Sequence, residues 1–250
     1  EFDEVIALCE GLKTAPLTSA QADYVKKLAS WSLNRRGETR SDMAAKAGEE
    51  GRAEEAGELD RLALADFEMA IELDATRAKP FHNRGVSRAL AGEYEAALSD
   101  FDKALSIHPG YANTWFNLGE VQYELGRLNE AQRSYTEAIR LAPDDADAHT
   151  SRANTSFALG AAERDLSRAR QHFFDAITDF NQVVRLRGGN ALAHANRGDA
   201  YRALRKWEWA SNDYQRAIKL DESLARAHAG LAWLMATCPE AEYRNVDEAL

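Results

Sequence analysis

Small and aromatic residues recur along this chain at helical spacing. An alanine is followed four positions later by an aromatic residue and three positions after that by alanine or, once, valine, so the three share one face of a helix. The five copies are Ala63/Phe67/Ala70, Ala97/Phe101/Ala104, Ala131/Tyr135/Ala138, Ala176/Phe180/Val183 and Ala210/Tyr214/Ala217. Three of the four intervals between copies are 34 residues, and the third is 45. Such a period predicts a repeat solenoid, an architecture that usually presents a surface rather than performing chemistry.

The segment from Ala112 to Asp145 gives the repeat most clearly. Its landmarks are Trp115, Leu118, Gly119, Gly126, Ala131, Tyr135, Ala138 and Pro143. Gly126 can adopt the left-handed conformation that ends a helix, and Pro143 blocks continuation into the next one. We therefore expect two helices of about 13 residues joined by a short turn.

These residues resemble the tetratricopeptide repeat, whose pattern is Trp-x2-Leu-Gly-x2-Tyr, then Ala-x3-Phe-x2-Ala, then Pro. Gln122 stands where the family has Tyr. The resemblance covers nearly the whole chain and is strongest from Ala78 to Asp145. It implies an all-α fold, a right-handed α-solenoid of antiparallel helix pairs that forms a superhelix. About five repeats are expected, with partial units at both ends.

The repeat landmarks divide the chain into one solenoid spanning 1–250. Its expected parts are a partial unit 1–29, units 30–77, 78–111, 112–145, 146–190 and 191–224, and a partial unit 225–250. Units 30–77 and 146–190 exceed the period by 14 and 11 residues. The segment 38–59 is rich in Ala, Glu and Gly, which predicts a loosely helical or mobile projection. Around 161–171 the apolar spacing predicts that the second helix is extended N-terminally by about three turns. Each insert is either a private binding element or a tolerated expansion.

The net charge of the chain limits the classes of partner that it is expected to bind. The net charge is −10, which argues against nucleic acid and anionic membrane surfaces as general partners. Two basic groups, Arg35/Arg36/Arg40 and Arg164/Arg168/Arg170, are interrupted by acids and are interpreted as solvated helix faces rather than binding patches. No run approaches the ~20 apolar residues of a transmembrane helix, so no membrane insertion is expected in this segment.

No group of residues suggests catalysis, a metal or a cofactor, so we expect a protein that is not an enzyme. Cys9 and Cys238 lie near opposite ends, have no zinc spacing, and are expected to behave as small apolar residues. His149, His194 and His228 occupy the fourth position of their units, where the family prefers Trp, and are expected to pack rather than bind metal. The acidic residues are expected on exposed faces beside Lys or Arg.

Two tryptophans start the second helix of unit 191–224. Because Trp207 and Trp209 are separated by one residue, one is expected to pack inward and the other to lie exposed. An exposed Trp can mark a partner contact. Ordinary half-buried packing is the alternative.

The resemblance also implies where a partner binds. In the family the first helix of each unit lines a concave groove. Carried onto this sequence, the expected partner-binding residues are Asn83, Asn117, Asn196, Ser151, Phe116, Tyr123, Asn154, Phe157, Arg202, Arg226 and Trp233. Asn83, Asn117 and Asn196 share the sixth position, and a column of such amides can pair with an extended backbone. The alternative is that these amides bond to the neighbouring helix.

A carboxylate clamp of the kind found in chaperone-tail receptors is not expected. Its positions hold His82, Val86, Asn117, Asp147 and Ser151 when aligned from unit 78–111. Aligned from unit 146–190 they hold Thr150, Asn154, Asn196, Arg226 and Gly230, of which only three match.

The leading functional hypothesis is a non-catalytic scaffold that binds a peptide segment or partner helix in the groove. Two alternatives remain open: the substrate-recruiting arm of a larger enzyme, and a structural array that self-associates through incomplete end repeats. The chain starts without Met at Glu1 and stops within an expected helix at Leu250, which suggests a piece of a longer protein. The segment 238–243 resembles one found in some bacterial arrays and hints at a bacterial source.

Overall fold

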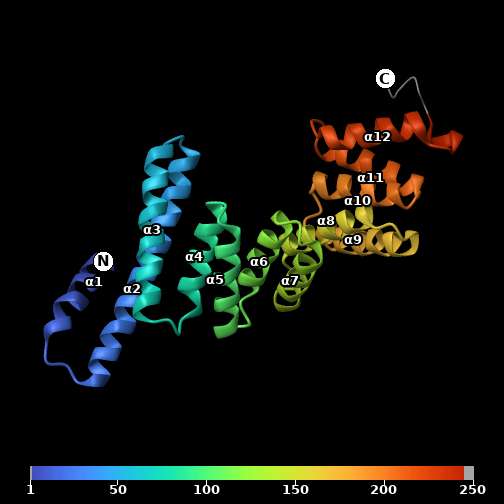
Figure 1. Cartoon of the computed structure of the whole chain (residues 1–250). Coiled ribbons are helices and arrows are strands. Elements are labelled where there is room, and N and C mark those ends of the chain that lie inside the picture. The colour runs from blue at the N-terminus through green and yellow to red at the C-terminus, as the bar shows by residue number, and fades with distance from the viewer. Residues whose placement is uncertain (1, 245–250) are drawn as a thin grey trace. The chain divides into compact units, whose positions relative to one another are not determined.

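The computed structural model describes residues 2–244, and Figure 1 shows their arrangement as successive helical hairpins. This part of the chain contains twelve α-helices, two short 3-10 helices and no strand. The α-helices are α1 (Phe2–Gly11), α2 (Ser19–Glu49), α3 (Ala53–Leu73), α4 (Ala78–Leu90), α5 (Tyr94–Ile107), α6 (Ala112–Glu124), α7 (Leu128–Leu141), α8 (Ala146–Ala162), α9 (Leu166–Leu186), α10 (Ala191–Ala203), α11 (Trp207–Leu220) and α12 (Ala225–Thr237); the 3-10 helices are η1 (Leu12–Thr14) and η2 (Ala241–Tyr243). The all-α solenoid of paired helices is confirmed.

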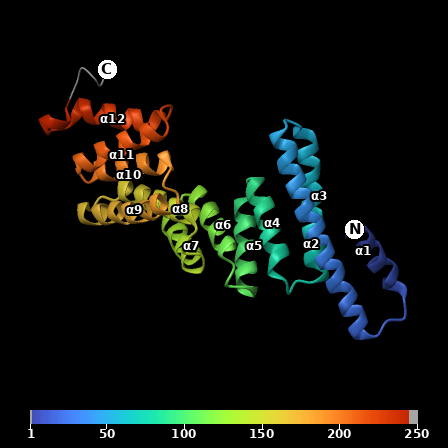
Figure 2. The ribbon, with the colours of Figure 1, turned by 180° about the vertical axis from the view of Figure 1, so that it is seen from behind.

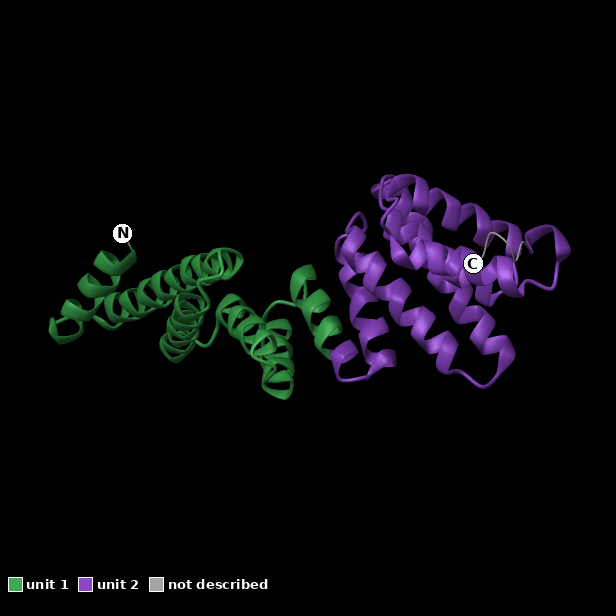
Figure 3. Cartoon of the chain, turned by 90° about the horizontal axis from the view of Figure 1, so that it is seen from above, with its two compact units in different colours: residues 1–121 green, residues 122–250 purple. Residues whose placement is uncertain are grey.

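The chain forms two compact units, which are described separately (Figure 3). Unit 1 comprises residues 1–121 and unit 2 residues 122–250. Within unit 1, α2 packs on α3 and α4 on α5, and Figures 1 and 2 both show α2 and α3 side by side. Within unit 2, α8 packs on α9 and α10 on α11. The partial unit predicted at 225–250 contributes α12, whereas the partner helix expected at 245–250 lies outside the described residues.

A glycine on the first helix lets the aromatic residue of the second approach closely. A Cβ added at Gly85 would lie 2.7 Å from the Phe101 ring, and one added at Gly198 would lie 2.8 Å from the Tyr214 ring. Both distances are shorter than van der Waals contact, so the two rings occupy space that only glycine leaves open. The rings are fully buried, which explains why Ala-x3-aromatic marks each repeat.

The turns of the α4–α5, α6–α7 and α10–α11 pairs each contain a left-handed residue. Gly92 and Gly126 have φ of 78° and 71°. In the α10–α11 turn Arg205 takes this place, with φ 57°. The turn therefore keeps its left-handed conformation although its glycine is replaced. A non-glycine residue in this conformation carries backbone strain.

The segment 38–59 is regular helix rather than the loose or mobile projection predicted from its glycines. It supplies the end of α2 and the start of α3, which turn at residues 50–52. Ala44 and Ala47 are buried, so small residues give α2 a face along which α3 packs. α2 begins after Thr18, which forms a capping box with Gln21, and runs through the repeat boundary expected at residue 30.

The second insert lengthens both helices of its pair. α9 has 21 residues where α11 has 14, and α8 has 17 where α10 has 13. The N-terminal extension predicted for the second helix is present, but it amounts to about two turns instead of three. The remaining insert residues extend α8 as far as Ala162.

The two neighbouring tryptophans separate as predicted. Trp207 is buried in a core cluster with Tyr214, Leu234 and Cys238, whereas Trp209 is 58% exposed. Cys238 is a free, buried thiol and acts here as a small apolar core residue.

The acidic residues do not all lie on exposed faces. Four helix pairs bury a carboxylate of the second helix against an arginine of the first, in a two-pronged ion pair. The pairs are Arg36–Asp66 and Arg84–Asp100 in unit 1, and Arg152–Asp179 and Arg197–Asp213 in unit 2, with N–O distances of 2.6 to 3.0 Å. The expectation was wrong because a fork-shaped guanidinium satisfies both carboxylate oxygens and allows them to leave water.

Each buried carboxylate has a second basic partner. Arg40 and Arg88 fill this role for Asp66 and Asp100. His149 and His194 fill it for Asp179 and Asp213, with Nδ1–Oδ1 distances of 2.8 and 2.9 Å. Burial raises the pKa of Asp213, but the bonds from Arg197 and His194 outweigh it, and the net pKa lies below its usual value. Two of the histidines that stand in place of Trp are therefore buried, as predicted, and each is the partner of a carboxylate; the third, His228, is exposed, and its Nε2 lies 2.9 Å from the Glu222 carbonyl oxygen, so the packing prediction was wrong for it.

Candidate functional site

In unit 2 a chain of polar contacts joins the first helices of successive pairs. Asn196 on α10 donates from Nδ2 to Oδ1 of Asn154 on α8, at 3.3 Å. Arg226 on α12 donates from Nη1 to Oδ1 of Asn196, at 2.7 Å. Three residues predicted to bind a partner are thus brought together, and they couple three helices that are not adjacent in sequence.

Asp199 extends this network along α10. It accepts a hydrogen bond from the Tyr214 hydroxyl at 2.8 Å and an ion pair from Nε of Arg226 at 3.3 Å. Nη2 of Arg202 lies 3.5 Å from the same carboxylate, and Nε of Arg202 donates to the Tyr214 hydroxyl at 3.2 Å. Burial is the main reason that the pKa of Tyr214 is raised, and the neighbouring Asp199 adds to it. The hydroxyl therefore remains a neutral donor.

The outer end of this network is exposed to solvent. The Arg202 guanidinium carbon stacks 4.6 Å from the centre of the Trp233 ring, and Trp233 is 43% exposed. Among residues 2–244, Nη1 of Arg202 and Nη2 of Arg226 make no hydrogen bond. We call the surface formed by Asn154, Asn196, Asp199, Arg202, Arg226 and Trp233 the α8–α10–α12 face. It combines an exposed aromatic ring with unused donors.

Unit 1 carries a smaller network of the same kind. Asn83 on α4 donates to Oδ1 of Asn34 and to Oε1 of Glu38 on α2, both at 3.0 Å. Lys79 lies 2.9 Å from the same carboxylate. Burial raises the pKa of Glu38, but Lys79 and the two amides outweigh it, so the net pKa is lowered. The carboxylate is held ionised between two helices.

The two networks follow one rule that sequence reasoning missed. A cation at the start of one first helix pairs with an acid on the preceding first helix, as Lys79 does with Glu38 and Arg226 with Asp199. The signal is present in the sequence, because each acid directly follows the glycine in the first helix of its repeat, in Gly37–Glu38 and Gly198–Asp199.

The remaining predicted residues are more scattered. Asn117 is half-buried and its amide makes no hydrogen bond to any residue the structure describes. Ser151 is half-buried, and Tyr123 is 36% exposed. Phe116 is half-buried. Phe157 packs against the α8–α9 core and lies 5.4 Å from the Phe173 ring, so much of its surface is already covered.

The three asparagines of the predicted column do not all behave in the same way. Asn83 and Asn196 bond to neighbouring helices, which is the alternative to backbone pairing with a ligand. Asn196 is also only 6% exposed. Of these three residues, only Asn117 has an amide without a hydrogen bond to another described residue.

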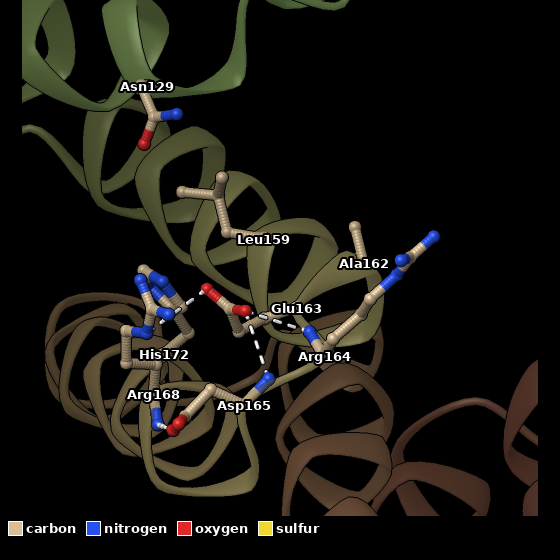
Figure 4. A pocket seen from close by; sticks show the side chains of 8 residues that line it. All are labelled: Asn129, Leu159, Ala162, Glu163, Arg164, Asp165, Arg168 and His172. Carbon is tan, nitrogen blue, oxygen red and sulfur yellow. Dashed lines mark hydrogen bonds and ion pairs between the residues drawn. The ribbon is translucent and has the colours of Figure 1, made fainter.

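The insert of the α8–α9 pair forms an open pocket of about 710 Å³, shown in Figure 4. Its charged groups mostly satisfy one another: Glu163 accepts from the backbone of Arg164 and Asp165 and lies 3.7 Å from Arg168. Hydrogen bonds from these backbone groups lower the pKa of Glu163. Nδ1 of His172, which also lines the pocket, is buried without a hydrogen-bond partner among the described residues. The balanced charges give this pocket no clear preference for a ligand.

Two structural properties bear on chemistry and location. Between residues 2 and 244, no three or more His, Cys, Asp or Glu residues gather as metal ligands would. None of the helices described there is both long and apolar enough to span a bilayer.

Two family models match parts of the chain. A model described as tetratricopeptide repeat matches residues 89–155, and one described as TPR repeat matches residues 198–236. No curated protein sequence matches the chain.

Solved structures share the fold. YrrB, described as a TPR protein with an unusual peptide-binding site, has a TM-score of 0.58 and 21% identity, over 75% of this chain and 88% of YrrB. MamA from Desulfovibrio magneticus RS-1 gives 0.59 and 16%, over 77% and 99%. PilF from Pseudomonas aeruginosa gives 0.61 and 17%, over 80% and 83%. At these identities the likeness establishes the fold alone.

Proposed function

Since this chain is a tetratricopeptide-repeat protein, we propose that it is a protein-interaction scaffold that binds a peptide segment of a partner on the α8–α10–α12 face. The repeat family supports the general role, because its members present helix faces to proteins or peptides. One observation supports the location: an exposed Trp233 stacked on Arg202 lies beside a polar network that has unused donors.

The chemistry of the face indicates the kind of contact. Trp233 and the two arginines belong to the residue types that carry most of the energy in protein interfaces. Nη1 of Arg202 and Nη2 of Arg226 can donate to carbonyl or carboxylate oxygens of a bound segment. Asn154 and Asn196 hold the helices in register and act on the partner indirectly.

Site-specific crosslinking tests the location. A photo-crosslinking residue in place of Ala229, exposed on α12, is expected to capture a partner from lysate of the source organism, and the crosslinked peptide identifies the bound segment. The same residue in place of Gln215, exposed on α11, serves as the matched control. Equal capture at both places would contradict the proposal.

Substitution then tests the anchors. The double variant R226A/W233A is expected to weaken binding of the captured segment at least about tenfold, because it removes two anchor side chains. W209A removes an exposed Trp elsewhere in unit 2 and is expected to leave the affinity unchanged. Both variants must first show wild-type helicity. Unchanged affinity in R226A/W233A would remove this face from the function.

A further inference from the structure

An apolar cavity of about 260 Å³ lies in unit 1, enclosed by α1, α2 and α3. Its walls include Ile6 and Cys9 from α1, Val25 and Ala29 from α2, and Met69 from α3. Ile6, Cys9 and Ala29 are 7%, 2% and 8% exposed, whereas Met69 is 42% exposed. The cavity is therefore deep on the α1–α2 side and reaches solvent near Met69.

The interior offers almost nothing for water or a polar ligand. Its one polar side-chain atom on the buried walls is the Cys9 sulfur, a weak donor. Burial raises the pKa of this thiol, so it remains neutral. An apolar cavity without hydrogen-bonding partners does not hold water well, which leaves it available to an apolar guest.

The mouth carries no net charge. Glu10, Lys13, Lys26 and Glu72 also line the cavity, and all four are exposed. None of them forms an ion pair with another residue in the described part of the chain. Two acids and two bases give neither an anionic nor a cationic head group an advantage.

We propose that this cavity binds a neutral apolar small molecule, of the size of a substituted benzene ring. An engineered apolar cavity of about 150 Å³ is enough to bind benzene, and this one is larger. The site is separate from the partner-binding role and uses none of its residues. Because the guest would contact α1 and the α2–α3 hairpin together, binding would strengthen the packing of α1 by mass action.

Toluene is a suitable probe, with benzoate and benzylammonium as charged analogues of the same ring. In spectra of methyl-labelled methionine, toluene is expected to shift the Met69 signal saturably. Met43 and Met235 lie outside the cavity and serve as internal references. Backbone amides of α1 are expected to exchange more slowly with toluene present. Both charged analogues should bind more weakly than toluene.

Filling the cavity gives the decisive variants. Ala29→Leu and Cys9→Leu add side-chain volume to the cavity from α2 and from α1, and each is expected to weaken toluene binding at least about tenfold. Ala20→Leu makes the same change as the first at an exposed position of α2 and is expected to leave binding intact. Two filling variants are used so that one remains informative if the other fails to fold. The proposal is wrong if toluene gives no saturable shift, if a folded filling variant binds it normally, or if a charged analogue binds as tightly.

Discussion

The helix pairs α4–α5 and α10–α11 have the same lengths, 13 and 14 residues, and the same close approach of an aromatic ring to a glycine. They differ in the second base on the buried carboxylate, Arg88 against His194, and in the turn residue, Gly92 against Arg205. They also differ in the ring, since Tyr214 carries a hydroxyl that Phe101 lacks. Steric positions are therefore constant between the pairs, while polar positions vary.

The largest expected effect comes from removing a buried carboxylate. Asp100→Ala leaves Arg84 and Arg88 facing each other without their shared partner and is expected to destabilise the protein by about 3 kcal/mol. Urea unfolding measures this effect. Lys103→Ala, an exposed change on α5, should alter stability by less than about 0.5 kcal/mol.

The chain itself supplies the compensating change. The sequence repeat 112–145 has Leu118 and Ser134 at the positions where α4–α5 has Arg84 and Asp100. The double variant R84L/D100S is therefore expected to recover most of the loss and lie within about 1 kcal/mol of wild type. If it is no more stable than Asp100→Ala, the ionic and apolar versions of the repeat are not interchangeable.

The α4–α5 pair should also respond to acid through His82. Burial, and to a smaller extent Lys79, lowers the pKa of His82 to about 4. The unfolded chain binds the His82 proton more tightly, so stability should fall as the pH drops from about 6.5 to 4, by up to about 3 kcal/mol. Unfolding of His82→Gln across this range should show a shallower slope. An unchanged slope would exclude His82 as its source.

The tyrosine hydroxyl should contribute less. Tyr214→Phe removes the hydrogen bond to Asp199 and is expected to cost about 1.5 kcal/mol, because the acceptor is charged. The reverse change in the other pair, Phe101→Tyr, should bring no gain, since Val86 stands where α10 has Asp199. A loss in Tyr214→Phe below about 0.5 kcal/mol would mean that water replaces the hydroxyl.

The smallest effect is a gain at the turn. Arg205→Gly relieves a non-glycine left-handed residue and is expected to stabilise the protein by about 1 kcal/mol, measured by urea unfolding. Gly92→Arg in the α4–α5 turn should lose a similar amount. If neither variant changes stability, the turn tolerates both residues equally.

Much of the fold was predictable because steric constraints repeat in the sequence. The Ala-x3-aromatic spacing gave the helix pairs, and the spacing of Trp207 and Trp209 gave one buried and one exposed ring. The loose projection at 38–59 was wrong because glycines and small residues also allow two helices to pack closely, as Ala44 and Ala47 do.

The buried ion pairs escaped prediction although their pattern is visible. Asp directly precedes the aromatic residue in four of the five motif copies, as in Asp100–Phe101, and each of those units has Arg before its first Gly or Ala. The fifth copy lacks both, with Ser134 and Leu118. The acidic residues were expected on the surface because they are charged. Whether such a residue is buried depends on an arginine partner that lies sixteen or more positions away in the sequence. At the candidate site, residues from the family's groove positions meet in unit 2, whereas the pairing of Asp199 with Tyr214 and Arg226 was not anticipated from the sequence.

Whether a polar contact lies within one repeat or joins two repeats affects how the repeats unfold. The Arg–Asp pairs join the two helices of one repeat and so raise the intrinsic stability of that repeat. Contacts such as Asn83 with Asn34 and Arg226 with Asp199 join neighbouring repeats and raise their coupling energy. A substitution at Arg226 would therefore alter both the proposed partner contact and the tendency of adjacent repeats to open together, so binding and cooperativity would be coupled through one side chain.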